Sequence, residues 1–316
     1  MWRQARTGRT FAIWPSVPLR ARLRARGRIV AVLAALSAAG LLVLSAPVWA
    51  RDKIAAAQVT PAEAAYENPK QAVLLKRQIS ALAPQKKGVT DIYAIGVAGW
   101  ATQDVFRKEL DGALASIGRA PSLNGGTVRL INHPETAQAI PLASRQNFAA
   151  AVRAVGRIMD KEEDVLILFI TSHGDAAGIG LQLPGILVNL GPAEVAAVLN
   201  KEGIKNRVVI VSACYAGIFV KPLENDNTIV LTAADAKSSS FGCVAGREWT
   251  YFGDAFFNQS LKPGTDFKRA FNNAKTLIEG WEKLDHVKPS NPQAHFGDAL
   301  VRKLEPLFDA TAQTGQ

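Results

Sequence analysis

Apolar residues at positions 91–285 follow two alternating patterns. Short continuous apolar runs are typical of buried strands, and apolar residues that recur every three or four positions are typical of helices with one buried face. The predicted strands are residues 91–97, 127–131, 165–170, 208–211 and 228–232, and the predicted helices are residues 103–117, 144–159, 191–200 and 267–284. Strands that alternate with helices predict an α/β fold, a three-layer sandwich in which helices cover both faces of a mainly parallel sheet.

Segments inside and around this alternation predict the domain limits. Residues 178–190 predict a hairpin that turns at Pro184-Gly185, because both residue types favour tight turns. Residues 51–90 predict a stalk or packing helix, with a capping box at 60–63 and helical spacing from Ala72 to Leu82. The main domain is expected to span residues 91–308, and the tail at 309–316 is expected to be disordered.

The first 50 residues have the composition of a secretory leader. Residues 1–28 contain eight arginines and no acidic residue, and no charge occurs from Ile29 to Ala50. This pattern predicts either a signal peptide cleaved after Ala50 or an uncleaved membrane anchor with the arginines on the cytoplasmic side. Both alternatives place the body of a bacterial protein in the periplasm, free or anchored to the inner membrane. A buried core helix is a third alternative, but it leaves the arginines unexplained.

The formal net charge of +10 suggests nucleic-acid binding only if it is spread over the chain. The eight arginines of the leader account for most of this charge and leave +2 for residues 29–316. A nearly neutral body argues against a basic groove for polyanions, so no nucleic-acid partner is expected. The sequence does not predict an oligomeric state.

Two of the predicted strands end in residues that could react together. His173-Gly174 follows the apolar run 165–170, and Cys214 follows the run 208–211 among small residues. Parallel strands present their carboxyl ends at one edge of a sheet, which is where such sheets bind ligands. The sequence therefore predicts an imidazole and a thiol at the same edge, the pairing of a nucleophile with its base.

These residues suit attack on a carbonyl carbon. A thiol attacks as the thiolate, so it needs a base nearby and access to the substrate. We assign Cys214 as the nucleophile and His173 as the general base and then the general acid. The backbone N–H groups of Gly174 and Cys214 are expected to form an oxyanion hole, in which one donor contributes about 3–4 kcal/mol to transition-state binding.

Other interpretations are open at the level of sequence. Cys214 could be an inert core cysteine or pair with Cys243 in a disulfide, and His173 could be hydrogen-bonded only locally. The four histidines lack ligand-type spacing with either cysteine, so no metal site is predicted. No glycine-rich phosphate loop follows the first strand, so no cofactor is predicted.

Three blocks of the sequence resemble the legumain-like cysteine peptidases, relatives of the caspases. They are residues 168–175 around His173, residues 209–217 around Cys214, and residues 231–243 with the segment 250–254 that follows. The blocks occur in the family's order, so the resemblance covers most of the body. It implies a caspase-like sandwich and peptide-bond hydrolysis through a thioester, without a cofactor.

The resemblance also implies residues that bind substrate. Ser239 and Ser240 would form one wall of the specificity pocket, and Asp254 would be its acidic floor. Ser212 stands where plant and animal members carry a Glu, two residues before the nucleophile, and we group it with the substrate-binding residues. Residues 99–103 occupy the region of the family's Arg-His pair. The serines could instead form only a polar loop, and Asp254 could be a helix N-cap.

The sequence as a whole predicts an exported or membrane-anchored cysteine endopeptidase that acts on proteins or peptides, with cleavage after Asn or Asp implied by the resemblance. A transamidase or ligase is an alternative, because transfer to an amine shares the same thioester. A non-catalytic envelope protein that uses the sandwich as a binding surface is a second alternative.

Overall fold

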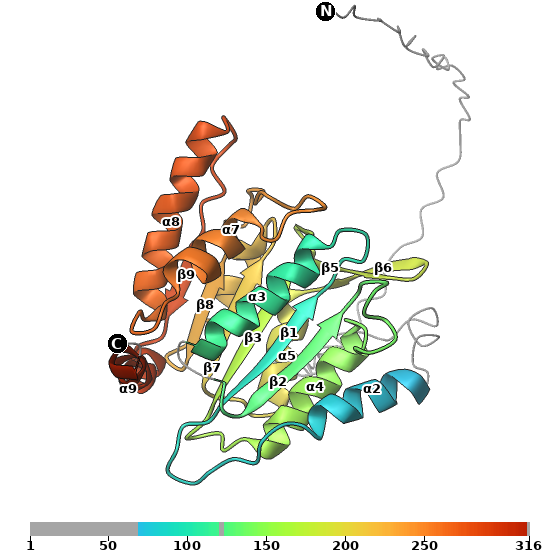
Figure 1. Ribbon diagram of the computed structural model, residues 1–316, viewed down its shortest axis with the longest axis vertical. Helices are drawn as coiled ribbons and strands as arrows, with labels where there is room; N and C mark the ends of the chain where they lie inside the picture. The colour runs from blue at the N-terminus through green and yellow to red at the C-terminus, as the bar shows by residue number, and fades with distance from the viewer. Residues whose placement is uncertain (1–68, 120–122, 315–316) are drawn as a thin grey trace, which may run out of the picture. The chain divides into compact units, whose positions relative to one another are not determined.

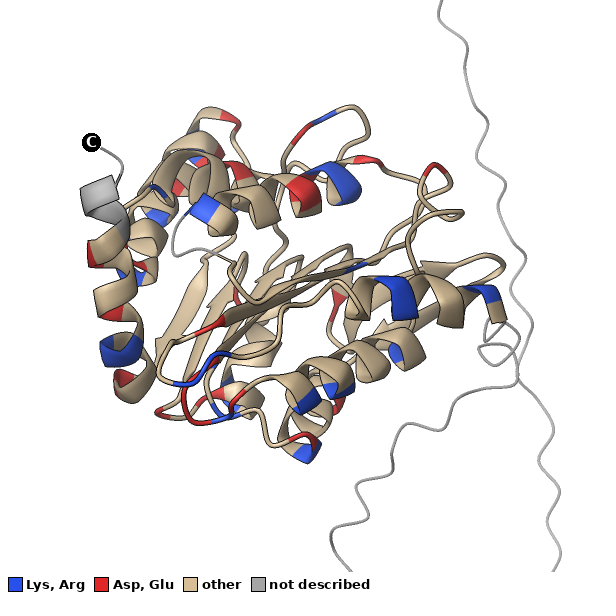
Figure 2. Ribbon diagram, turned by 60° about the horizontal axis from the view of Figure 1, so that its bottom comes forward, with Lys and Arg blue, Asp and Glu red and all other residues tan. Residues whose placement is uncertain are grey.

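The computed structural model describes residues 69–119 and 123–314. The predicted leader and the capping box at 60–63 lie outside these residues. Helices lie on both faces of a central sheet (Figure 1), and the edge-on view in Figure 2 separates the three layers. The three-layer α/β sandwich predicted from the sequence is therefore confirmed.

The central sheet has six strands in the order β2-β1-β3-β7-β8-β9. These strands are β1 (Ile92–Ala98), β2 (Gly126–Ile131), β3 (Val165–Thr171), β7 (Arg207–Ser212), β8 (Thr228–Thr232) and β9 (Gln293–Phe296). The first five strands of this order are parallel to their neighbours, and β9 is antiparallel to β8. The sheet is therefore mainly parallel, as predicted, with one antiparallel edge strand.

Helices connect the strands and follow the sequence-based boundaries closely. They are α2 (Pro69–Ile79), α3 (Val105–Arg119), α4 (Arg145–Ile158), α5 (Pro192–Lys201), α6 (Val220–Leu223), α7 (Tyr251–Gly253), α8 (Phe267–Leu284) and α9 (Asp298–Thr314), with short helical segments at Ala216–Phe219 (η2) and Asp254–Ser260 (η3). Side chains fix where two of them begin: Ser144 accepts the N–H of Asn147 at the start of α4, and Asp266 accepts that of Arg269 at the start of α8.

Alternation along the strands divides the core into two halves. In β3, Val165, Ile167 and Phe169 pack in one cluster with α3, η3, α8 and α9. The residues between them pack in the other cluster with α2, α4, α5 and α6. Because side chains of a strand alternate between faces, odd-numbered residues of β3 point toward α3. By the same criterion the even-numbered residues Val208 and Ile210 of β7 point toward α3.

A small antiparallel sheet extends from the end of β3. It consists of β4 (Gly174–Asp175), β5 (Gly178–Leu183) and β6 (Ile186–Leu190), and β5 and β6 form the predicted hairpin that turns at Pro184-Gly185. The backbone N–H of Gly180 donates to the carbonyl of His173 at 2.9 Å. This sheet therefore holds the backbone of His173 directly after the strand.

The end of the chain differs from its prediction. Helix α9 continues to Thr314, into the segment 309–316 that the sequence predicted to be disordered. Leu304 and Phe308 are buried in the core cluster, and the Phe308 ring lies edge-on to that of Phe267 with centroids 5.2 Å apart. Burial of these side chains holds the helix as far as Phe308, and its backbone stays helical to Thr314, which corrects the prediction for residues 309–314.

Charged residues of both signs lie mainly on the outer surfaces of the helices and in the loops (Figure 2). Within residues 69–119 and 123–314, no helix is both long and apolar enough to cross a bilayer. The predicted anchor, residues 29–50, lies outside that part of the chain.

Candidate active site

Strand register brings the two reactive segments to one edge of the sheet. β3 and β7 are parallel neighbours, and Thr171 lies opposite Ser212 at their carboxyl ends. The backbone N–H of Ser172 donates to the carbonyl of Ser212 at 3.3 Å. Beyond the strands, a Cβ on Gly174 would collide with the backbone oxygen of Cys214. The backbone after His173 therefore touches the backbone of Cys214, and glycine is what permits this approach.

The His173 ring lies against aromatic side chains near helix α3. Its centroid is 4.7 Å from that of Trp100 and 5.1 Å from that of Phe106, both in edge-on contact. The side chain is half-buried. Burial disfavours the charged ring and lowers the pKa of the His173 imidazole below its usual value. The ring is therefore held neutral, the state in which it can accept a proton.

Gln103 fixes the orientation and tautomer of this ring. Its Oε1 lies 2.5 Å from His173 Nε2, while its Nε2 donates to the carbonyl of Cys243 at 2.9 Å. The bond to Cys243 defines which end of the amide faces the ring. Because Oε1 can only accept, His173 Nε2 carries the proton and Nδ1 keeps a free lone pair. Gln103 lies in the segment that replaces the Arg-His pair, and no motif in the sequence marks it for a role.

Ser240 and its loop border the sulfur of Cys214. The backbone N–H of Ser240 donates to Sγ at 3.3 Å, and Sγ lies 3.6 Å from the Ser240 carbonyl oxygen. Cys214 itself is half-buried. Tyr215 has φ of 58°, which few non-glycine residues adopt, and its N–H donates to the Ser238 carbonyl at 2.9 Å. The chain thus turns sharply just after Cys214 and is tied to the same loop.

The four residues predicted to bind substrate have different surroundings. Ser239 is exposed beside Ser240, in the loop next to the sulfur. Ser212 is buried, and its hydroxyl lies 3.0 Å from Glu109 Oε1, behind the strand end. Asp254 lies in η3 and accepts hydrogen bonds from Asn258 and Gln259 at 2.7 and 3.2 Å.

The helix that contains Asp254 begins earlier than the N-cap interpretation requires. Thr250 is the N-cap of α7, and its side chain accepts the N–H of Gly253. Asp254 therefore lies inside the helical segment, which corrects the alternative in which its carboxyl caps that segment.

The second cysteine, Cys243, forms no disulfide with the predicted nucleophile. Cys214 and Cys243 are both free, so the alternative 214–243 disulfide does not form in this structure. Burial, with further contributions from the charges of Cys214 and Glu109, raises the pKa of the Cys243 thiol to about 12. Cys243 is therefore a thiol at neutral pH.

Glu109 lies beneath the edge that carries both motifs. This residue of α3 is fully buried, and its carboxylate accepts hydrogen bonds from the hydroxyls of Thr171, Ser212 and Thr250. Burial raises the pKa of the Glu109 carboxyl to about 7, and these hydrogen bonds act in the opposite direction. No sequence motif marks Glu109, because its partners come from distant segments.

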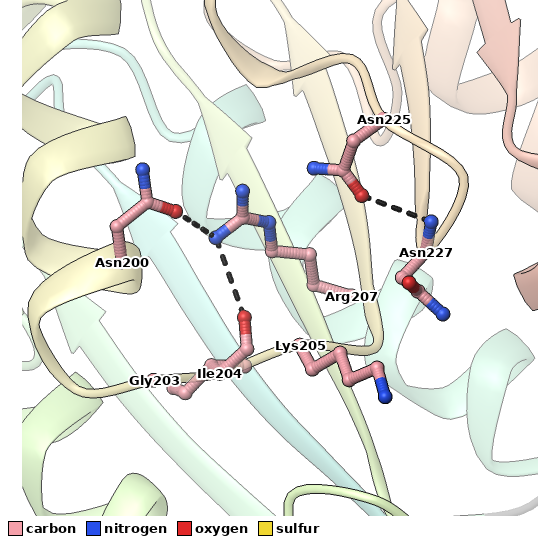
Figure 3. A pocket seen from close by; sticks show the side chains of 7 residues that line it. All are labelled: Asn200, Gly203, Ile204, Lys205, Arg207, Asn225 and Asn227. Carbon is pink, nitrogen blue, oxygen red and sulfur yellow. Dashed lines mark hydrogen bonds between the residues drawn. The ribbon is translucent and has the colours of Figure 1, made fainter.

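A pocket of about 280 Å³ lies at the opposite edge of the sheet. Arg207 opens β7 there, and its guanidinium donates to Asn200 at 2.8 Å and to the Ile204 carbonyl at 3.3 Å (Figure 3). Cys214 follows the other end of the same strand. Because a strand of this length spans about 20 Å, the pocket does not belong to the edge that carries the two motifs.

Across residues 69–119 and 123–314, no group of three or more metal-ligating side chains is close enough to hold an ion. The site therefore consists of a thiol, an oriented imidazole, a serine-containing loop and a buried carboxyl below them.

Comparison with known proteins gives a family match and a structural similarity. Residues 144–302, which include both His173 and Cys214, match the model of the Peptidase C13 family. No match was found among curated proteins. Caspase-1 from Spodoptera frugiperda, one of 93 matching chains of known structure, is 10% identical, with 68% of this chain and 93% of that chain covered and a TM-score of 0.46.

Proposed function

Because the chain belongs to the Peptidase C13 family, we propose that it is an exported or membrane-anchored cysteine endopeptidase that hydrolyses peptide bonds. Family membership supports cysteine peptidase chemistry. The contact between Gly174 and the backbone of Cys214 carries the assignment to these residues, because it brings the histidine and cysteine segments together at one edge of the sheet.

The proposed reaction uses the free nitrogen of the imidazole. His173 Nδ1 takes the proton from Cys214 Sγ, and the sulfur attacks the carbonyl carbon of the peptide bond. The N–H groups of Gly174 and Cys214 bind the oxyanion that forms. His173 then donates its proton to the departing amine, which leaves a thioester on Cys214.

Water completes the turnover. His173 takes a proton from the water as it attacks the thioester carbonyl, and collapse of the intermediate releases the acid product and the sulfur, which regains its proton. Gln103 keeps its hydrogen bond to Nε2 throughout, so the ring keeps its orientation.

For specificity, we propose Ser239, Ser240 and Asp254 as the residues to test for cleavage after Asn or Asp. Ser240 is supported by its contact with Cys214 Sγ. Asn258 and Gln259 both donate to Oδ1 of Asp254 and fix its carboxyl, which keeps further acceptor sites for a substrate side chain. Ser212 is proposed to act from behind the site, since its hydroxyl is buried.

Cleavage of a peptide library by the purified full-length protein tests this proposal. We expect defined cleavage products that are lost in Cys214→Ala and in His173→Ala, and labelling of Cys214 by an electrophilic peptide. Cys243→Ala is the matched control, because it removes the other thiol and should leave labelling unchanged. Unaltered cleavage by folded Cys214→Ala would refute the proposal, and absence of both cleavage and labelling in wild type would favour a non-catalytic binding protein.

Addition of an amine nucleophile separates hydrolysis from transfer. Both reactions share the thioester, so only the products differ. Hydrolysis predicts mainly the free acid, and coupled product in excess of acid would instead identify a transamidase or ligase.

The proposed location is the periplasm, reached by a cleaved signal peptide or held at the inner membrane by an anchor. The eight arginines followed by an uncharged segment support it. N-terminal sequencing of the protein from membrane and soluble fractions tests it: a start at Arg51 indicates cleavage, and an intact leader in the membrane fraction indicates an anchor.

A further inference from the structure

Helix α3 places one carboxylate where the two motif-bearing strands end. Odd residues of β3 and even residues of β7 face α3, so Thr171 and Ser212 both point toward it. Each of these residues precedes its motif residue by two positions. Glu109 Oε2 accepts the hydroxyl of Thr171, and Oε1 accepts that of Ser212 at 3.0 Å. One side chain thus connects the ends of both strands.

The same carboxylate also holds the segment that follows the serine-containing loop. Thr250 donates to Glu109 Oε1 at 2.6 Å, and Thr250 Oγ1 accepts the N–H of Gly253 at 3.1 Å. A Cβ on Gly253 would collide with Oε1, so glycine lets the backbone of this segment approach the carboxylate closely. Asp254 is the next residue. Glu109 therefore binds three residues, Thr171, Ser212 and Thr250, that lie shortly before His173, Cys214 and Asp254 in the chain.

We infer that Glu109 is a positioning residue for the peptidase site, which fixes the His173 strand, the Cys214 strand and the Asp254 segment relative to one another. It does not touch substrate, because it is fully buried. Neither the family match, which begins at residue 144, nor the three motif blocks include Glu109.

Donor counting explains why a carboxylate suits this position. Thr171, Ser212 and Thr250 each have one hydroxyl proton to donate. An ionised carboxylate accepts from all of them, so every donor is directed to one point. A glutamine has the same shape, but its NH₂ group would replace one acceptor, and a hydroxyl opposite it must rotate to accept.

We therefore expect Glu109→Gln to keep the fold but to lose the alignment of the strand ends that precede His173 and Cys214. The hydroxyl partners can turn to suit an amide, whereas the strand ends lose a shared acceptor. We compare it at about pH 8, where the wild-type carboxyl is ionised. Two readouts are used: kcat and KM with a cleaved peptide, and the rate at which iodoacetamide modifies Cys214, with the modified cysteine mapped by mass.

Asp164→Asn is the matched control. Asp164 is also fully buried and lies just before β3, at the opposite end of the strand from the site. Its two carboxylate oxygens accept the N–H groups of Asp91 and Asp160 at 2.9 and 2.7 Å. An amide can replace only one of these acceptors, so we expect a lower unfolding midpoint but kcat within about twofold of wild type.

For Glu109→Gln we expect kcat to fall about tenfold or more with a smaller change in KM, slower modification of Cys214, and no drop in unfolding midpoint. Equal losses of kcat in Glu109→Gln and Asp164→Asn, or an unchanged kcat in folded Glu109→Gln, would overturn the inference. If Glu109→Gln does not fold, Thr171→Val removes a single donor, and unchanged kcat and Cys214 modification in that variant would overturn it.

This inference rests on the proposed peptidase function, but the two can fail separately. If wild type cleaves no peptide, the proposed function fails, and a slower modification of Cys214 in Glu109→Gln still supports positioning. If wild type cleaves peptides and Glu109→Gln matches it in both readouts, only the positioning role fails.

Discussion

At the scale of residues, the site depends on contacts that allow little substitution. Gly174 and Cys214 touch through their backbones. Gln103 accepts a hydrogen bond from His173, and its second hydrogen bond, to the Cys243 carbonyl, fixes the orientation of its amide. The reactive pair was visible in the sequence because both residues follow apolar strands. The orienting amide was not, since nothing in its local pattern distinguishes it from any polar residue at the start of a helix.

Gln103→Leu should lower kcat about tenfold or more, because the imidazole loses the acceptor that fixes its tautomer. Gln103→Glu keeps an acceptor for Nε2–H and should retain more activity than the leucine variant. Steady-state kinetics with a cleaved peptide measures kcat of the three proteins, which should fall in the order wild type, Gln103→Glu, Gln103→Leu. Equal kcat in wild type and the leucine variant would contradict the role of Gln103.

Gly174→Ala should reduce activity and destabilise the fold by about 1–3 kcal/mol, because the new Cβ collides with the backbone of Cys214 and must displace it. Denaturant unfolding and peptide cleavage measure both effects. Gly280→Ala in α8 is the control: its Cβ meets nothing within 4 Å, so we expect normal cleavage and up to about 1 kcal/mol of added stability.

At the scale of elements, α3 organises the site from one face of the sheet. Its residues contact His173 through Phe106 and both strand ends through Glu109. Its first turn also holds the loop after Cys243: the Gly246 N–H donates to Asp104 at 2.8 Å, and Lys108 pairs with Glu248 at 2.8 Å. This helix was predicted at 103–117, but only its packing shows what it supports.

Asp104→Ala should loosen the loop at 243–249. The Gly246 N–H, which is the main cause that lowers the pKa of the Asp104 carboxyl to about 2, would lose its acceptor. We expect faster amide hydrogen exchange in this loop, with little change in the strands β3 and β7. Arg269→Ala, at an exposed position of α8, should leave exchange in the loop unchanged. Exchange in the loop that is equal in Asp104→Ala and wild type would show that Asp104 does not hold it.

At the scale of the whole molecule, one buried carboxyl links stability to pH. Burial raises the pKa of Glu109 from 4.5 to about 7, so the folded state binds this proton more tightly than the unfolded chain does. The stability that it contributes is fully present below pH 4.5 and is lost as pH rises to about 7. Full burial leaves no solvent to screen this effect.

The unfolding free energy of wild type, relative to Glu109→Gln, should therefore fall by up to about 3 kcal/mol between pH 4.5 and pH 7.5. Urea unfolding of both proteins across this range measures the difference, and comparison with the glutamine variant cancels the titration of all other groups. A constant difference would mean that Glu109 titrates alike in the folded and unfolded states.

The sequence by itself determined the alternation of strands and helices, because burial on one face imposes a local period on each element. It also indicated His173 and Cys214, since parallel strands bring their carboxyl ends to one edge. Strand β9 was missed because its four residues follow a turn-like segment and carry no apolar run.

Only the tertiary structure decided the surroundings of the reactive pair. Register set Thr171 opposite Ser212, and the packing of α3 then brought Glu109 beneath both. Buried hydrogen bonds between segments as far apart in sequence as Glu109 and Thr250 leave no periodic trace along the chain. They form because a desolvated carboxylate requires donors, and the fold alone determines which side chains are within reach.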